Sequence, residues 1–186
     1  MKLMSLLVLF WSAAAFSQNY GTPELTFTGY KFTEKEAVSG TFKKINWSYS
    51  KSGAAKDVIV NTTAVIDSYS IEAGKPARNT NITNGLFKKW GGQNINVKVT
   101  AFDLASQVAQ VQISIGKLSR VVPFKVSESD AALVFAGSID LIEFGLGKAF
   151  QSLSKLCAIH HKGKDGVVKT WSVVDLEVKL PKVAAN

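Results

Sequence analysis

Apolar and polar residues alternate along most of the chain, and a period of two is typical of β-strands that bury one face. The alternation is clearest over residues 95–99, 111–115, 122–126, 133–141 and 174–180, where every second residue is apolar or glycine. Short connections separate most of these segments, so we expect them to pair as antiparallel hairpins.

The first half of the chain predicts three further strands. Residues 24–32 and 38–49 also alternate, but the parity of the apolar positions shifts by one within each, in the first at Gly29. Such a shift is typical of a β-bulge in a curved strand. With residues 58–71 as another strand the total is about eight. A sandwich and a barrel both fit this count, and the shifts favour a closed, strongly curved barrel.

Two segments interrupt the alternation. The first, Ser70–Trp90, contains Pro76, which is suited to the first turn of a helix. The second, Gly145–Gly166, has apolar residues at the spacing of one helix face. The sequence therefore predicts a mainly β fold, an eight-stranded antiparallel barrel with two short helical inserts.

The N-terminus has the features of a cleaved secretory signal. Lys2 gives a positive start, an apolar run extends to Phe16, and Ala15-Phe16-Ser17 suits a signal peptidase. We expect residues 1–17 to be the signal peptide and residues 18–186 to form one domain. No cysteine near the cleavage point could carry a lipid anchor, and no later apolar run is long enough to span a membrane. These features predict a periplasmic or secreted protein.

The amount and distribution of charge indicate which classes of partner the protein could bind. The formal net charge is +8, but the lysines are scattered and no basic helix or zinc-finger spacing is present. Nucleic acid is therefore not expected as a partner. The positive charge favours solubility beside an anionic membrane, with transient contact at its surface.

Candidate metal and catalytic residues are few. His160 and His161 are adjacent, so on a helix they point in different directions and do not easily chelate one ion. Cys157 lies one turn from His160, but two ligands are too few for a metal site. The chain has no nucleophile motif of the G-x-S-x-G type. We expect no metal, no catalytic residues and no cofactor apart from a bound lipid.

The phenylalanine content points to an extensive apolar interior. The chain has eleven, and several lie on the inward parity of the predicted strands: Phe27, Phe42, Phe124 and Phe135. An aromatic core and an apolar ligand tunnel use the same residues, so this pattern leaves both open.

Four stretches, in chain order, resemble one family. They are "LTFTGYKFTEKEAVSGTF", "IDSYSIEAGKPARNTNITNGLF", "VQISIGKLSRVVPFKV" and "FAGSIDLIEFGL". These resemble, in the same order, the N-terminal strands, the glycine turn with its arginine motif, a strand pair and a return strand of the YceI-like family. The resemblance covers nearly the whole chain after the predicted signal.

The resemblance implies a periplasmic or secreted protein with an extended, lipocalin-like barrel. Its long apolar tunnel would bind a polyisoprenoid or another long-chain amphiphile for carriage, storage or stress protection, and a homodimer is compatible with it. Arg78 and Asn81 are the candidates for the headgroup at the mouth. The expected tunnel residues are Phe27, Phe42, Phe87, Val97, Val99, Ile113, Phe124, Phe135, Ile139 and Phe144.

The chain departs from the family pattern after Arg78. Asn79 and Asn81 stand where the family often has aspartate and histidine, so acid–base chemistry at these positions is lost while hydrogen bonding is retained. Two alternatives stay open at this point. One is a solid-core β module of the cell envelope that binds protein or glycan, and the other is a lipid-modifying enzyme.

Overall fold

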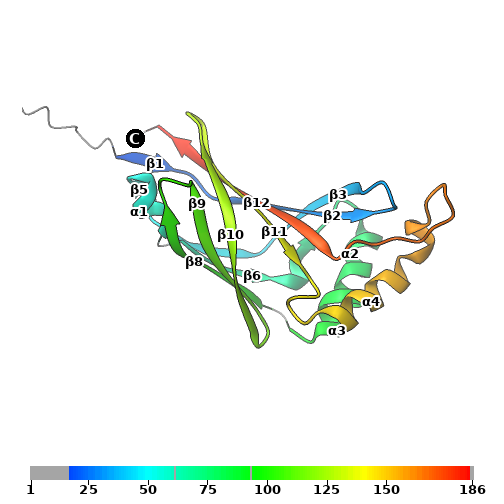
Figure 1. Cartoon of the computed structure of the whole chain (residues 1–186). Helices are drawn as coiled ribbons and strands as arrows, with labels where there is room; N and C mark the ends of the chain where they lie inside the picture. The colour runs from blue at the N-terminus through cyan, green and yellow to red at the C-terminus, as the bar shows by residue number, and fades with distance from the viewer. Residues whose placement is uncertain (1–16, 61, 93, 185–186) are drawn as a thin grey trace, which may run out of the picture.

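The computed structural model describes residues 17–60, 62–92 and 94–184, and the expected signal peptide lies outside this range except for Ser17. One antiparallel sheet curls around an apolar interior (Figure 1). Helices α2 (Pro76–Ile82), α3 (Lys88–Trp90) and α4 (Gly147–Leu156) gather at the end of the sheet opposite the C-terminus, whereas α1 (Ala55–Val60) lies beside β1 (Gln18–Tyr20) and β5 (Ser52–Gly53) near the C-terminus (Figure 1). Within the described ranges, no helix combines the length and apolar character needed to cross a membrane.

The sheet follows the order β4-β6-β8-β9-β10-β11-β12-β2-β3-β7, with β1 paired to β12 and β5 paired to β1. Each pairing is antiparallel. The strands are β1 (Gln18–Tyr20), β2 (Glu24–Lys31), β3 (Glu36–Phe42), β4 (Ile45–Ser48), β5 (Ser52–Gly53), β6 (Thr63–Asp67), β7 (Ile71–Glu72), β8 (Asn94–Asp103), β9 (Val108–Ile115), β10 (Leu118–Glu128), β11 (Ala132–Asp140) and β12 (Val173–Val183).

The chain itself joins the two ends of the curled sheet. β3 pairs with β2 near one end of the strand order, and β4 pairs with β6 at the other end. Only Lys43 and Lys44 separate β3 from β4. The backbone N–H of Lys43 donates to the Ser70 carbonyl (2.9 Å), and that of Asp67 donates to the Lys44 carbonyl (3.0 Å). The mainly β, strongly curved architecture predicted from the sequence is confirmed.

Two details of the strand prediction are wrong. The described residues form twelve strands instead of eight. Three of the additional strands, β1, β5 and β7, contain only two or three residues and are too short to show alternation, and the single strand predicted over residues 38–49 is divided into β3 and β4. The bulge expected at Gly29 is not present, since β2 pairs with β3 and β12 in continuous register. A register shift occurs instead in β8, between Val99 and Ala101.

Residues 58–71 do not form the single strand that was predicted. Helix α1 (Ala55–Val60) comes first, β6 follows, and a 3₁₀ turn, η1 (Ser68–Ser70), ends the segment. Val58 and Ile59 are both buried although they are neighbours in the chain, which a helix allows and a half-buried strand does not. The Thr62 hydroxyl donates to the Val58 carbonyl at 2.8 Å and helps to end the helix.

Both predicted helical inserts are present at the same end of the sheet (Figure 1). The first contains α2 (Pro76–Ile82), a π-helical turn η2 (Thr83–Phe87) and α3 (Lys88–Trp90). The second contains α4 (Gly147–Leu156) and a 3₁₀ turn η3 (Ala158–His161). The inserts pack on each other at Gly85, where a Cβ atom would lie 2.9 Å from the Leu153 Cα. Glycine at this position therefore allows the backbones of η2 and α4 to approach closely.

Candidate functional site: an apolar cavity with a cationic end

The curled sheet and the helical inserts enclose a cavity of about 520 Å³. Inward-facing residues of the long strands form most of its wall, and both inserts contribute residues at one end. Its volume lies within the range of ligand sites, roughly 300–1,000 Å³. The interior of the sheet is therefore not filled completely by side chains.

Nine of the ten residues expected to line a tunnel lie in the wall of this cavity. They are Phe27, Phe42, Phe87, Val97, Val99, Ile113, Phe124, Phe135 and Ile139. Phe144 is the exception: it is buried, with 3% of its surface exposed, and it packs in the core without lining the cavity. It follows β11 in a turn closed by the Leu146 N–H bonding to the Leu141 carbonyl (3.0 Å), so the strand alternation no longer sets its direction.

Three phenylalanines connect the sheet wall to the first insert. The ring centroids of Phe27 on β2 and Phe42 on β3 are 5.5 Å apart, and those of Phe42 and Phe87 on η2 are 6.0 Å apart. Both pairs are tilted, at distances typical of favourable aromatic contacts. This contact series positions the insert over the apolar wall.

Arg78 lies at the helical end of the cavity and is half-buried. Its Nη1 donates to the Ala73 carbonyl at 2.6 Å, which fixes one side of the guanidinium. The neighbouring Asn79 side chain accepts from the Ala73 N–H (2.7 Å) and donates to Glu72 Oε1 (3.2 Å). Lys43 forms an ion pair with Glu72 at 2.6 Å. Lys43, together with Asn79 and the Gly74 N–H, lowers the pKa of Glu72 to about 2.

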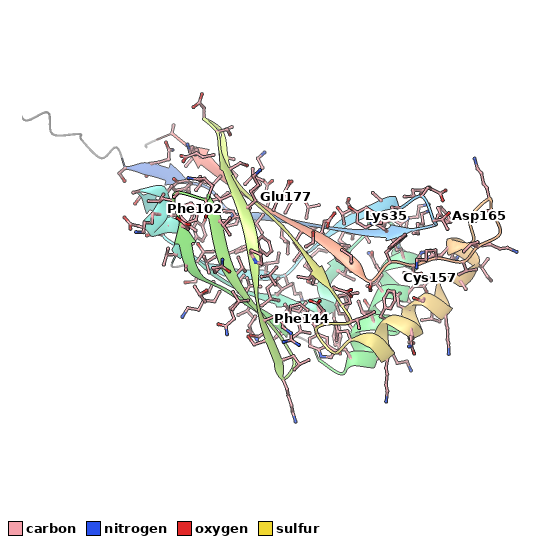
Figure 2. The ribbon with its side chains drawn as sticks, in the orientation of Figure 1. Lys35, Phe102, Phe144, Cys157, Asp165 and Glu177 are labelled. Atoms are coloured by element: carbon pink, nitrogen blue, oxygen red, sulfur yellow. The ribbon has the colours of Figure 1, made fainter. Side chains whose placement is uncertain are left out.

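Asn81 and Cys157 lie beside Arg78 and also line the cavity. Burial raises the pKa of the Cys157 thiol, while Arg78 and a hydrogen bond with Asn81 act in the opposite direction. Cys157 sits at the end of α4, where Figure 2 labels it, and only 8% of its surface is exposed. At neutral pH the thiol is therefore uncharged and behaves as a small apolar group of the wall.

His161 also lines this end of the cavity. Its Nδ1 lies 2.7 Å from the Thr170 hydroxyl oxygen, and its pKa is lowered by burial and by electrostatic interactions with Lys31, His160 and Arg78. Lys31 is at the end of β2, where it forms an ion pair with Glu36 (2.8 Å). These residues come from separate elements and meet only through the fold.

Sequence reasoning placed Arg78 and Asn81 at the mouth and left the roles of Cys157, His160 and His161 open; the structure brings all five into the cavity wall. It did not identify Lys31, Lys75 or Trp171 as wall residues. Lys31 ends a strand, Lys75 lies in a turn, and Trp171 follows the hairpin after η3. No sequence pattern links these three positions.

Acidic side chains are absent from the described part of the wall. This part of the wall therefore contains no carboxylate that could act with a histidine as a general acid–base pair. In the described ranges, no group of three or more His, Cys, Asp or Glu side chains is arranged to hold a metal ion. What this arrangement can do chemically is solvate an apolar chain and present hydrogen-bond donors at one end.

Comparison with known proteins identifies solved structures that have a similar fold. No protein-family model and no curated protein matches the sequence. Among solved structures, a polyisoprenoid binding domain from Saccharophagus degradans, implicated in plant cell wall breakdown, matches with a TM-score of 0.61 and 17% identity, covering 92% of this chain and 99% of that chain. Burkholderia cenocepacia BcnA matches with a TM-score of 0.58 and 17% identity, over 87% of this chain and 96% of that chain.

A YceI protein of Campylobacter jejuni also matches, with a TM-score of 0.53 and 11% identity, over 98% of this chain and the whole of that chain. At these identities the likeness concerns the fold. The chain therefore has the fold of the YceI-like proteins that its sequence motifs resemble.

Proposed function

We propose that the protein binds the apolar chain of a long lipid in its internal cavity, as a carrier or store and not as an enzyme. The observation that carries this proposal is the cavity of about 520 Å³ with a wall of inward-facing aliphatic and aromatic residues. An extended apolar chain bound against such a wall is removed from water. The predicted signal peptide adds that the lipid is handled outside the cytoplasm, in the periplasm or after secretion.

The hydrophobic effect supplies the affinity in this proposal. Each methylene moved from water into an apolar site contributes about 0.8 kcal/mol. That corresponds to roughly fourfold tighter binding per methylene until the cavity is full. The cost of ordering the chain reduces the total, but it does not change the dependence on chain length.

An isoprenoid chain is our first candidate. The support is the fold shared with the Saccharophagus degradans domain, which is described as polyisoprenoid binding. The alternative of a solid-core interaction module predicted that large side chains would meet across the axis and fill the interior. A cavity of this size does not fit that alternative.

We also propose a surface for contact with an anionic membrane, next to the helical end of the cavity. Ile159 is 88% exposed, and Val167 and Val168 are each 47% exposed. Four lysines and one aspartate, Asp165, lie between residues 155 and 169. Figures 1 and 2 show this segment at the extremity of the molecule, where Asp165 is labelled. Exposed apolar side chains surrounded by lysines suit the headgroup region of an anionic bilayer.

Native mass spectrometry with lipid extraction, on protein purified from its own host, tests the main proposal. We expect a bound long-chain lipid, and delipidated protein should take up prenyl or acyl chains. A protein that is always empty and takes up neither chain would overturn the proposal.

A pair of variants localises the binding. Val97 lines the cavity, and Val65, on the neighbouring strand, is exposed. Val97→Trp should weaken uptake at least about tenfold, because the indole would displace several methylenes of the ligand. Val65→Trp is the matched control and should bind as the wild type does. Equal binding by both variants would place the lipid outside the cavity.

A further inference from the structure

The charged residues of the cavity wall are all basic. Lys31, Lys75 and Arg78 lie at the helical end, together with His160 and His161. Among the described residues that line the cavity, none is an aspartate or a glutamate. The remainder of the wall is dominated by aliphatic and aromatic side chains, so the cavity has one cationic end and one apolar body.

Among the described residues at this end, Arg78 is the half-buried cation that forms no ion pair; Lys75 forms none either, but it is exposed to solvent. Lys31 is paired with Glu36, and Glu72, which lies close in sequence, is paired with Lys43. Within the described chain, no carboxylate lies within 4.0 Å of the Arg78 guanidinium, which donates a hydrogen bond to the Ala73 carbonyl. The guanidinium therefore keeps N–H donors that the protein does not use.

An acidic headgroup satisfies these donors better than a neutral one. A half-buried charge beside an apolar space is costly unless an opposite charge or hydrogen bonds compensate it. Guanidinium binds carboxylate and phosphate oxygens in a planar, bidentate geometry, with hydrogen bonds stronger than those between neutral groups. An alcohol offers one neutral oxygen, and an amine would add a like charge.

We infer that the cavity is selective for amphiphiles with an acidic headgroup, a carboxylate or a phosphate, and that Arg78 binds this headgroup while the apolar body of the cavity holds the chain. The inference rests on the proposed lipid-binding function and narrows it to a class of ligand. Asn81 and His161 line the same end of the cavity as Arg78 and complete the polar surroundings of the headgroup.

Ligands that share one chain and differ in headgroup test this inference. Delipidated protein would be titrated with hexadecanoic acid, hexadecyl phosphate, hexadecanol and hexadecylamine, with displacement of a fluorescent lipid as the signal. We expect at least one of the two acids to bind at least about tenfold more tightly than the alcohol, as is typical of a charged hydrogen bond. The amine should bind most weakly. Preference for the phosphate over the carboxylate, or the reverse, would identify which acid the site favours.

The variant Arg78→Gln then assigns the effect to one residue. It should reduce the difference between acid and alcohol to about threefold or less, because the acid loses its oppositely charged partner while the chain-binding wall is intact. Arg120→Gln is the matched control: it removes the same charge from the exposed face of β10, outside the cavity wall, and should keep the wild-type preference.

The outcomes distinguish failure of the acid selectivity from failure of the proposed lipid binding. Equal binding of acids and alcohol by the wild type would overturn the acid selectivity and leave the lipid-binding proposal intact. Loss of the preference in Arg120→Gln as well as in Arg78→Gln would show that general charge, and not Arg78, attracts the acid, and would also overturn the inference. Binding of none of the four ligands would overturn the proposed function itself.

Discussion

Gly137 on β11 is the position where a single methyl group would most directly test the packing of the cavity wall. A Cβ atom at this position would lie 2.8 Å from Cδ2 and 2.9 Å from Cε2 and Cγ of Phe124. The Phe124 ring therefore lies flat against the backbone of β11, and it is 96% buried, with an exposed fraction of 4%. Gly137→Ala would force this ring toward the cavity.

Gly29 on β2 provides a matched control for the size of the effect. It also lines the cavity, but a Cβ atom there would meet nothing within 4 Å. Neither glycine has a positive φ, so alanine is conformationally acceptable at both positions. Both substitutions gain about 0.5–1 kcal/mol from the lower entropy of the unfolded chain. The difference between the two variants is then the packing cost alone, about 1–3 kcal/mol.

Urea unfolding of delipidated protein, followed by tryptophan fluorescence, measures this difference. Gly29→Ala should be as stable as the wild type or slightly more stable, and Gly137→Ala should be less stable with an unchanged m-value. Thermal melts should show the same order, at roughly 2–4 °C per kcal/mol for a domain of this size. Equal stabilities of the two variants would refute the contact between Phe124 and the β11 backbone.

Three further predictions concern the helical end. Burial lowers the pKa of His161, so this imidazole is protonated less readily in the folded protein than in the unfolded chain, and the folded protein loses stability as the pH falls below about 6.5. His161→Gln should therefore reduce the loss of Tm between roughly pH 7 and pH 5. An unchanged loss of Tm would contradict this prediction. Ile159→Glu should weaken cosedimentation with phosphatidylglycerol vesicles several-fold, whereas Leu104→Glu, at another exposed apolar position, should not. Gly85→Ala should lower the free energy of unfolding by about 1–3 kcal/mol, and with it the urea midpoint, because its Cβ would clash with Leu153 on α4. A wild-type midpoint would show that the inserts are not closely packed.

The cavity wall was largely predictable because it depends on strand parity. Once one residue of a strand faces inward, the next inward positions follow two residues apart, as with Phe135 and Ile139 on β11. The prediction was wrong at Phe144, where a turn replaces the strand and parity has no meaning. It was also wrong over residues 58–71, because a short apolar run fits a buried helix turn and a strand equally well.

The cationic end was only partly predictable, for a different physical reason. Arg78 and Asn81 belong to one motif, so sequence alone could select them together. Lys31 and His161 are more than a hundred residues apart, and they meet because β2 and the segment after η3 are bridged at Lys31 and Thr170. Such a contact depends on how the sheet curls, which local patterns do not encode.

The departure of this chain from the family pattern after Arg78 now has a structural explanation. Asn79 donates to Glu72 Oε1, and an aspartate in its place could not donate this hydrogen bond and would add a like charge beside Glu72. The neutral amide thus binds Glu72 Oε1 while Lys43 pairs with Oε2, and it adds no carboxylate beside Arg78. With asparagine at position 79 and no acid in the described part of the cavity wall, the Arg78 guanidinium remains available to the acidic headgroup that we propose.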